Sequence, residues 1–478
     1  MRIQDICILL TVGFLSTTVY GNFAGSAAAV DIGIVDQAKK IGMPIIEQTL
    51  NDYKMDKITF DGGWVDNVDL QFQFNSLDAI KVSFDGSQNA VRVTADNING
   101  TINGDFMYKL LLIQAKGHFK VTLFNDAVKL DMVVPLTSQS VDGRNMPTVD
   151  ISKFDLDIDH FKFRIDITGS VLADISDAFV TMFKKLILKE INAAINDKVP
   201  ALAKDTINSM IAKTNGRVSV YDKIMMDITF ASNPVISDSG MALYLNSTVY
   251  EEGSGYKIPL VPISDIQVLP STPQSVQVSL SHFAADSFLM ALQEMNLFSY
   301  TINDKTLGSM SSMLTTTYLD GLLPGLQAKY GKDQPVTIEA KTSQAPRTLF
   351  KLDNFGILMT MDMIFRVNNE VAIVVSLQDF VSTVQVTLKE TNMTVKVLTC
   401  KVSQVSASQS QIGEFSSDDF RAFFNVGSKI AIPFINNIFL NTPFVLPNTY
   451  LNMVRIQAAE FKSFDNYLAV SVTPEFIV

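Results

Sequence analysis

The sequence is poor in the residues that build most metal sites and disulfide frameworks. Its 478 residues include three histidines, two cysteines and one tryptophan. This supply excludes a metal site made from a His or Cys cluster and a framework of several disulfides. The Gly-x-Ser-x-Gly, Gly-x-Gly-x-x-Gly, phosphate-loop and His-Glu-x-x-His motifs are also missing. We therefore expect no enzyme, no cofactor and no metal.

Charge is scarce as well. Charged residues make up 18% of the chain and hydrophobic ones 47%, and the net charge is −11. A nucleic-acid binder needs Lys and Arg against phosphate, so this balance argues against a nucleic-acid partner. The apolar content excludes a disordered chain, and the scattered charges exclude a protein with several membrane spans. Composition predicts a globular, unusually apolar protein.

The first residues have the pattern of a secretory signal peptide. Arg2 precedes an apolar stretch at 6–15, and small residues follow at Gly21 and Gly25. The pattern predicts a signal peptide at 1–21 and a protein that is secreted or enters the lumen of the secretory pathway. Three sequons then predict N-glycosylation of a secreted glycoprotein, at Asn99, Asn246 and Asn392.

Removal of this segment would leave a single cysteine. Cys7 lies within the predicted signal peptide, so Cys400 would have no partner in its own chain. A disulfide at Cys400 would then have to join two molecules. The alternating stretch 393–402 around it favours a buried, inert thiol instead.

Hydrophobic periodicity divides the first half into helices and strands. A period of two predicts strands at 68–74, 80–84, 119–123 and 128–132. In 154–167 the apolar phase slips by one near residues 159 and 160, which predicts a bulge or a sharp bend in one long strand. A helical period predicts helices at 34–50, interrupted by Pro44, and at 171–199, ended by Pro200.

The second half repeats this order of elements after a Gly- and Pro-rich linker at 251–273. The same periods predict strands at 276–280, 359–367, 371–377, 384–388, 395–402 and 467–471, and helices at 284–295 and 419–440. The chain also has 32 Phe and 20 Met, many of them on the long helices. This surplus is consistent with an ordinary core and with a pocket for an irregular apolar ligand.

Four stretches resemble a known family. They are 228–262 (ITFASNPVISDSGMALYLNSTVYEEGSGYKIPLVP), 275–302 (SVQVSLSHFAADSFLMALQEMNLFSYTI), 154–187 (FDLDIDHFKFRIDITGSVLADISDAFVTMFKKLI) and 436–476 (NNIFLNTPFVLPNTYLNMVRIQAAEFKSFDNYLAVSVTPEF). In their order and spacing they resemble the bactericidal/permeability-increasing and lipopolysaccharide-binding protein family, which includes the plasma lipid transfer proteins.

The resemblance implies an α+β fold: an elongated boomerang of two antiparallel β-barrels, each closed by long helices and joined by a central sheet. The implied parts are an N-terminal lipid-binding barrel at 22–235, a central sheet and proline-rich linker at 236–275, and a C-terminal lipid-binding barrel at 276–478. The family's usual disulfide in the first barrel has no counterpart here, because 191–200 contains no cysteine.

The resemblance also implies a function. We expect a lipid-binding protein that takes phospholipid acyl chains into apolar pockets and transfers or presents them, with peripheral contact to membranes or lipid particles. The alternative is a host-defence protein of innate immunity that binds lipopolysaccharide. Helix faces place the expected pockets at Ile41, Ile45, Phe179, Phe183 and Ile187 in the first barrel and at Phe288, Leu292, Phe423, Phe424 and Phe434 in the second.

The stretch 104–117 (GDFMYKLLLIQAKG) matches the tip of the first barrel, where antibacterial members carry clustered cations. Here it has only Lys109 and Lys116. Its apolar side chains are therefore expected to contact a membrane, and the residues assigned to this role are Phe106, Met107, Tyr108 and Leu111. A plain buried pair of strands is the other interpretation of the same stretch.

Overall fold

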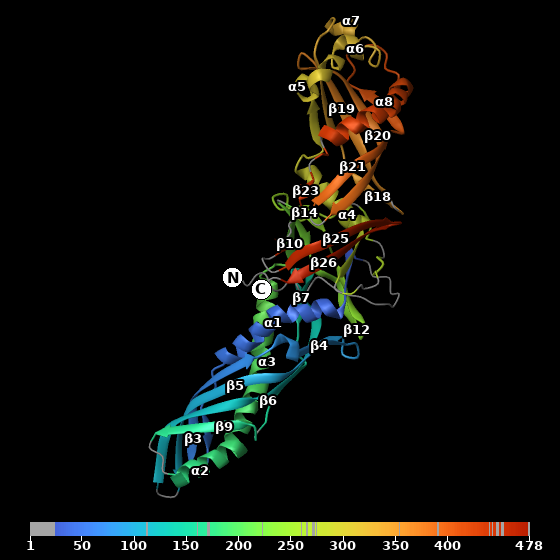
Figure 1. Cartoon of the computed structure of the whole chain (residues 1–478). Helices are drawn as coiled ribbons and strands as arrows, with labels where there is room; N and C mark the ends of the chain where they lie inside the picture. The colour runs from blue at the N-terminus through green and yellow to red at the C-terminus, as the bar shows by residue number, and fades with distance from the viewer. Residues whose placement is uncertain are drawn as a thin grey trace.

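The structure, a computed structural model, describes residues 24–476 apart from gaps at 111–112, 160, 170–172, 222, 260, 264–265, 270–272, 274, 353, 390–391, 439, 442, 446–448 and 451–453. The predicted signal peptide lies outside the described residues. The described part is elongated, with helix α2 (Ala173–Met182) near one end and α6 (Thr316–Leu319) and α7 (Leu326–Tyr330) near the other (Figure 1). Each described helix is too short or too polar to cross a membrane.

The largest sheet has 15 strands and extends from the N-terminal half into the middle of the molecule. Its strands pair in the order β2-β3-β5-β6-β7-β12-β13-β1-β15-β26-β25-β24, with β4 on β5 and both β8 and β9 on β6. Their bounds are β1 (Ser26–Val30), β2 (Ile58–Phe60), β3 (Gly63–Phe74), β4 (Ile80–Asp85), β5 (Ala90–Leu110), β6 (Ile113–Val141), β7 (Arg144–Val149), β8 (Lys153–Ile158), β9 (Phe163–Gly169), β12 (Phe230–Ser237), β13 (Gly240–Leu245), β15 (Val276–Ser281), β24 (Thr449–Tyr450), β25 (Val454–Phe464) and β26 (Tyr467–Phe476).

Two smaller sheets complete the β structure. An eight-stranded sheet forms the C-terminal half from β16 (Ser299–Ile302), β17 (Val336–Thr342), β18 (Arg347–Lys351), β19 (Asn354–Val367), β20 (Glu370–Lys389), β21 (Asn392–Lys401), β22 (Gln404–Ser408) and β23 (Phe444–Val445). A three-stranded sheet contains β10 (Arg217–Tyr221), β11 (Ile224–Asp227) and β14 (Val249–Glu251). Every strand pairing within the described ranges is antiparallel.

Strand β1 was not predicted, although it joins the two halves. It pairs with β13 on one side and with β15 on the other, and all five of its residues are buried. Four of them are serine and alanine, which have little strand propensity, so sequence periodicity gave no signal. Because β1 connects strands from both halves, the largest sheet contains strands from all three predicted parts of the chain. The domain limits at 22–235, 236–275 and 276–478 stay predictions.

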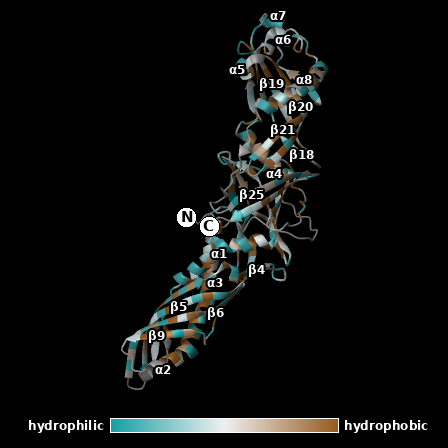
Figure 2. Ribbon diagram, viewed as in Figure 1, coloured by the Kyte–Doolittle hydropathy of each residue, from teal (hydrophilic) through white to brown (hydrophobic). Residues whose placement is uncertain are grey.

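Long helices pack on these sheets. The helical elements are α1 (Ile32–Asp52), η2 (Leu77–Ala79), α2, the π-helical turn η3 (Phe183–Ile187), α3 (Leu188–Ala212), α4 (His282–Glu294), α5 (Asp304–Leu307), η4 (Gly308–Met313), α6, α7 and α8 (Ser417–Ile438). Helix α1 contacts β3, β4 and α3, helix α3 contacts β7 and β8, and α8 contacts β21 and β22. Figure 2 shows apolar and polar residues alternating along the strands and helices of both halves.

The four predicted helices are confirmed, whereas the one long strand predicted at 154–167 is divided into two strands at the phase slip. Residues 34–50, 171–199, 284–295 and 419–440 correspond to α1, the α2–η3–α3 run, α4 and α8. At the slip β8 ends at Ile158, β9 begins at Phe163, and both strands pair with β6. The antiparallel sheets and packed helices confirm the α+β class. The boomerang of two closed barrels stays a prediction.

The prediction that Pro200 ends the second helix is wrong. Helix α3 continues to Ala212. Proline removes one backbone hydrogen bond and kinks a helix, but tertiary packing can outweigh that loss. Beyond Pro200, the helix buries Ala203, Met210 and Ile211 against the sheets, so its last three turns are held by contacts outside the helix.

Asparagines fasten the long helices to the strands. Asn196 on α3 accepts a hydrogen bond from the Leu156 N–H (2.8 Å) and donates one to the Leu156 carbonyl (3.0 Å). Asn208 does the same to Val149, at 2.8 and 2.9 Å. The other helix asparagines that bridge both backbone groups of one residue are Asn51 on α1, with Phe72, and Asn425 and Asn436 on α8, with Val402 and Val397. The side-chain amides thus satisfy strand backbone groups as a neighbouring strand would.

Candidate functional site

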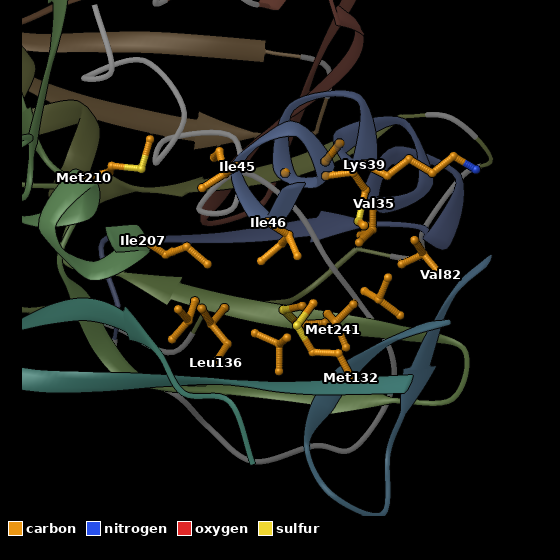
Figure 3. A pocket seen from close by; sticks show the side chains of 17 residues that line it. Val35, Lys39, Ile45, Ile46, Val82, Met132, Leu136, Ile207, Met210 and Met241 are labelled. Atoms are coloured by element: carbon orange, nitrogen blue, oxygen red, sulfur yellow. The ribbon is translucent and has the colours of Figure 1, made fainter. Parts of the chain in front are cut away.

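A cavity of about 140 Å³ lies in the N-terminal half between α1, α3 and the sheet (Figure 3). Seventeen residues line it, and Lys39 is the only charged one among them. The lining residues are Val35, Ala38, Lys39, Gly42, Met43, Ile45 and Ile46 on α1, Val82 on β4, Val91 and Val93 on β5, Met132, Val134 and Leu136 on β6, Val149 on β7, Ile207 and Met210 on α3, and Met241 on β13.

The periodicities of the chain explain why this space is apolar. On α1, Val35, Gly42 and Ile46 recur at helical spacing and face the sheet. On β6, Met132 and Val134 lie two residues apart and therefore point to the same face. Side chains from five strands and two helices thus meet at one place, and the site can bury an apolar group.

Lys39 lies at the edge of the cavity. Its ammonium donates to the Asp36 carboxylate (2.8 Å) and to the Ile80 carbonyl (3.0 Å), and its side chain is 11% exposed. The side chain extends away from the labelled apolar residues in Figure 3. The alkyl stem therefore lines the space while the charge is paired outside it.

The volume limits what the cavity can hold. An apolar cavity of about 150 Å³ stays dry and binds benzene. The present cavity is of similar size, at about 140 Å³. It therefore accommodates about six carbons of an apolar chain.

The predicted first pocket divides between this cavity and the core. Ile45 lines the cavity, whereas Phe179, Phe183 and Ile187 are fully buried in the core and do not. The rings of Phe179 and Phe183 contact those of Phe106 and Phe119, with centroids 4.0 to 6.2 Å apart. The side chain of Ile41 lies outside the described residues. The aromatic residues thus fill their part of the interior.

The residues of the predicted second pocket are not brought together. Phe288 and Leu292 pack on a small cluster around Ile224 and Val249 in the middle of the molecule. Phe424 packs on the C-terminal core, 5.7 Å from the ring of Phe380. Phe423 is 56% exposed, and the side chain of Phe434 lies outside the described residues.

The predicted tip is a β-hairpin made by strands β5 and β6. Strands β5 and β6 remain paired up to Leu110 and Ile113. Strand alternation turns Phe106 inward, where it is 1% exposed, so its assignment as a membrane contact is not met. Met107 and Tyr108 are half-buried, and Leu111 lies outside the described residues.

The predicted glycosylation sites differ in exposure. Asn392 is exposed at the start of β21. Asn99 and Asn246 are half-buried, and their side-chain amides donate to Asn75 (2.7 Å) and Thr229 (2.7 Å). Of the three, Asn392 is the one whose amide is open to modification.

Buried ionisable groups occur away from the cavity. Thr348 donates to the Asp286 carboxylate from its backbone N–H (2.6 Å) and its hydroxyl (2.7 Å), and the same hydroxyl is 3.0 Å from His282 Nδ1. Burial raises the pKa of Asp286 and lowers the pKa of His282. This cluster joins α4 to β18. The described residues include no group of three or more candidate metal ligands.

Comparison with known proteins assigns the chain to a family. The sequence pattern of the LBP / BPI / CETP family, C-terminal domain, matches residues 218–475, more than half of the chain. The chain belongs to the LBP/BPI/CETP family. Membership of this family indicates a lipid-binding protein.

One solved structure supports the fold. The crystal structure of a lipopolysaccharide binding protein is 14% identical, covers 95% of this chain and 99% of its own, and has a TM-score of 0.53. Takeout 1 of Epiphyas postvittana is 15% identical, covers 34% of this chain and 76% of its own, and has a TM-score of 0.19. No curated protein sequence matches the chain significantly. The first structure shows that this chain has the fold of the LBP/BPI/CETP family.

Sequence reasoning missed most of the cavity lining. Val35 and Ile46 lie on the predicted first helix, and Met132 lies on a predicted strand. Their periodicity shows that they face inward but does not show that space remains between them. Met210 lies on the part of α3 beyond Pro200, and Met241 lies on β13, and periodicity predicted neither segment. No local pattern connects these two residues with α1.

Proposed function

We propose that this protein binds lipid acyl chains in the cavity between α1, α3 and the sheet and transfers phospholipid between membranes or lipid particles. The cavity carries this proposal, because 16 of its 17 lining residues are uncharged and the charge of Lys39 is paired at its edge. The headgroup would stay outside, since the lining offers it no polar partner in the interior.

A balance between two apolar environments makes exchange feasible. Two acyl chains of about 16 carbons gain roughly 25 kcal/mol on leaving water. Release into water is therefore too costly. Movement between an apolar cavity and a bilayer costs far less, so transfer takes place during contact with the membrane.

Uptake of a whole chain requires the cavity to enlarge. About six carbons fit in the present volume, so α1 and the sheet must move apart to admit more. Helix α1 is the wall suited to this movement. Pro44 interrupts its hydrogen bonding and Gly42 lowers its helix propensity.

Charge at the tip hairpin favours phospholipid over lipopolysaccharide. Binding to the phosphates of lipid A would need clustered, unpaired cations. The hairpin stretch 104–117 carries only Lys109 and Lys116. On the segment beside it, Lys54 and Lys57 pair with Asp69 (3.5 Å) and Asp66 (3.3 Å). We therefore propose lipopolysaccharide binding only as the alternative, marked by an affinity that high salt abolishes.

Secretion and the absence of an enzymatic activity are part of the same proposal. The signal-like pattern at 1–21 supports an extracellular or luminal location, where lipid particles and membrane surfaces are accessible. The charge-poor lining supports binding without catalysis.

The test is transfer of a fluorescent phosphatidylcholine between vesicles, together with mass spectrometry of lipid extracted from the protein purified from its native source. Val134→Phe places a ring in the cavity, and Val141→Phe makes the same change on an exposed part of β6. We expect Val134→Phe to slow transfer at least about tenfold while Val141→Phe leaves it unchanged. Equal transfer by both folded variants would remove the cavity from the function.

A further inference from the structure

Gly42 lies at the centre of the face of α1 that lines the cavity. At 3.6 residues per turn, the lining positions from Val35 to Ile46 form one side of the helix, and position 42 falls in its middle. A side chain there would point between α1 and the sheet. The cavity thus lies where α1 has no side chain.

Backbone geometry does not require this glycine. The φ angle of Gly42 is outside the positive range, unlike that of Gly62 or Gly325. Glycine inside a helix is destabilising relative to alanine, because it loses more conformational freedom on folding. A reason other than backbone conformation must explain its presence.

Close packing does not require it either. A Cβ at Gly100 would lie 2.9 Å from the Phe72 ring, and one at Gly104 would lie 2.7 Å from the Phe119 ring. A Cβ at Gly42 meets no atom within 4 Å. Gly100 and Gly104 make room for neighbouring rings, whereas Gly42 borders open space.

We propose that Gly42 reserves the space for the end of one unbranched acyl chain and so sets the chain length that the site binds best. This inference rests on the proposed function and identifies a specificity-determining residue within it. The ligand class is a single-chain or two-chain amphiphile whose polar group stays outside, near Lys39.

The size of the effect follows from the volume. A leucine side chain adds four carbons, and the cavity holds about six. Gly42→Leu should therefore exclude about four methylenes of the ligand. Each lost methylene weakens the affinity about fourfold, so the affinity for a long chain should fall roughly 200-fold. Gly42→Ala should cost only about fourfold.

Competition with saturated fatty acids of increasing chain length tests this proposal. Each fatty acid competes with a bound fluorescent fatty acid on the wild type, Gly42→Ala and Gly42→Leu. Urea unfolding gives the free energy of unfolding of each protein. Gly427→Leu is the matched control, because Gly427 also lies within a long helix, α8, and a Cβ there meets only Phe423, at 3.8 Å.

The expected result is an opposition between stability and binding. Gly42→Leu should resist urea better than wild type, yet lose roughly 200-fold in affinity for long chains while binding the shortest chains nearly as well. Gly427→Leu should leave every affinity unchanged. Equal weakening at all chain lengths, or wild-type affinity for long chains, would overturn the role of Gly42. Failure of the wild type to bind any fatty acid or phospholipid would instead overturn the proposed function.

Discussion

The asparagines of α3 offer the most quantitative test of what holds the N-terminal half together. Asn196 makes two hydrogen bonds to the backbone of Leu156, and Asn208 makes two to Val149. Leu156 and Val149 are 0% and 3% exposed. Truncation of either asparagine would therefore leave a backbone N–H and a carbonyl without a partner in a region that water barely reaches.

The cost can be worked out from these contacts. A hydrogen bond contributes about 0.5–1.5 kcal/mol net, and a buried group left unpaired costs about 1–3 kcal/mol. Alanine recovers about 0.6 kcal/mol through its higher helix propensity. Asn196→Ala and Asn208→Ala should each lower the free energy of unfolding by about 2–3 kcal/mol.

Asn192 supplies the matched control on the same helix. Its side-chain oxygen is buried and has no hydrogen-bond partner. Asn192→Ala should therefore leave the free energy of unfolding unchanged or raise it by about 0.6 kcal/mol. Urea unfolding followed by the fluorescence of Trp64, the one tryptophan, reports on this half of the molecule. If Asn192→Ala cost as much as Asn196→Ala, the reasoning about backbone bridging would be refuted.

Three further predictions concern charge, reactivity and the core. A hydrogen bond from Arg92, with another from Lys153, lowers the pKa of Asp131 from 3.8 to about 2. The ionised carboxylate therefore stabilises the fold above pH 3.8, and this stabilisation is lost as the pH falls toward 2. Asp131→Asn should reduce the decrease in the free energy of unfolding between about pH 6 and pH 2, measured by urea unfolding. Burial raises the pKa of the Cys400 thiol. Iodoacetamide at pH 8 should therefore alkylate Cys400 at least about tenfold more slowly in the folded protein than in the urea-unfolded one. Equal rates would contradict the burial of Cys400. Phe183→Ala should lower the free energy of unfolding, measured in urea, by about 3–5 kcal/mol because the ring is fully buried. A decrease of less than about 1 kcal/mol would show that the ring is not closely packed.

Sequence periodicity predicted those elements whose buried face carries large apolar side chains. Phe179 and Phe183 mark the inner face of the second long helix and are fully buried there. Strand β5 was not predicted, because several of its inward positions are small, such as Ala95, Gly100 and Gly104, and polar residues alternate with them. The small residues make room for rings on neighbouring strands, a tertiary relation that no local pattern shows.

The candidate site was harder to predict than the fold. Regular spacing of aromatic residues indicated Phe179 and Phe183 as pocket residues, but large rings at regular spacing fill a core. The cavity depends on a missing side chain at Gly42 and on methionines from distant strands, Met132 and Met241. Periodicity identifies which residues face inward, whereas an unfilled volume depends on how separate elements meet.

Photoaffinity labelling with a lipid probe locates the acyl chains that we propose to bind between α1 and the sheet. A phosphatidylcholine with a diazirine near the end of one chain is offered in vesicles, irradiated with the protein, and the labelled peptides are identified by mass spectrometry. We predict labels on the residues of α1 that line the cavity, such as Val35 and Ile46, and on Met132 or Met241, which line it from the sheet. Labels confined to the C-terminal half, or spread over the surface without enrichment at these residues, would contradict it.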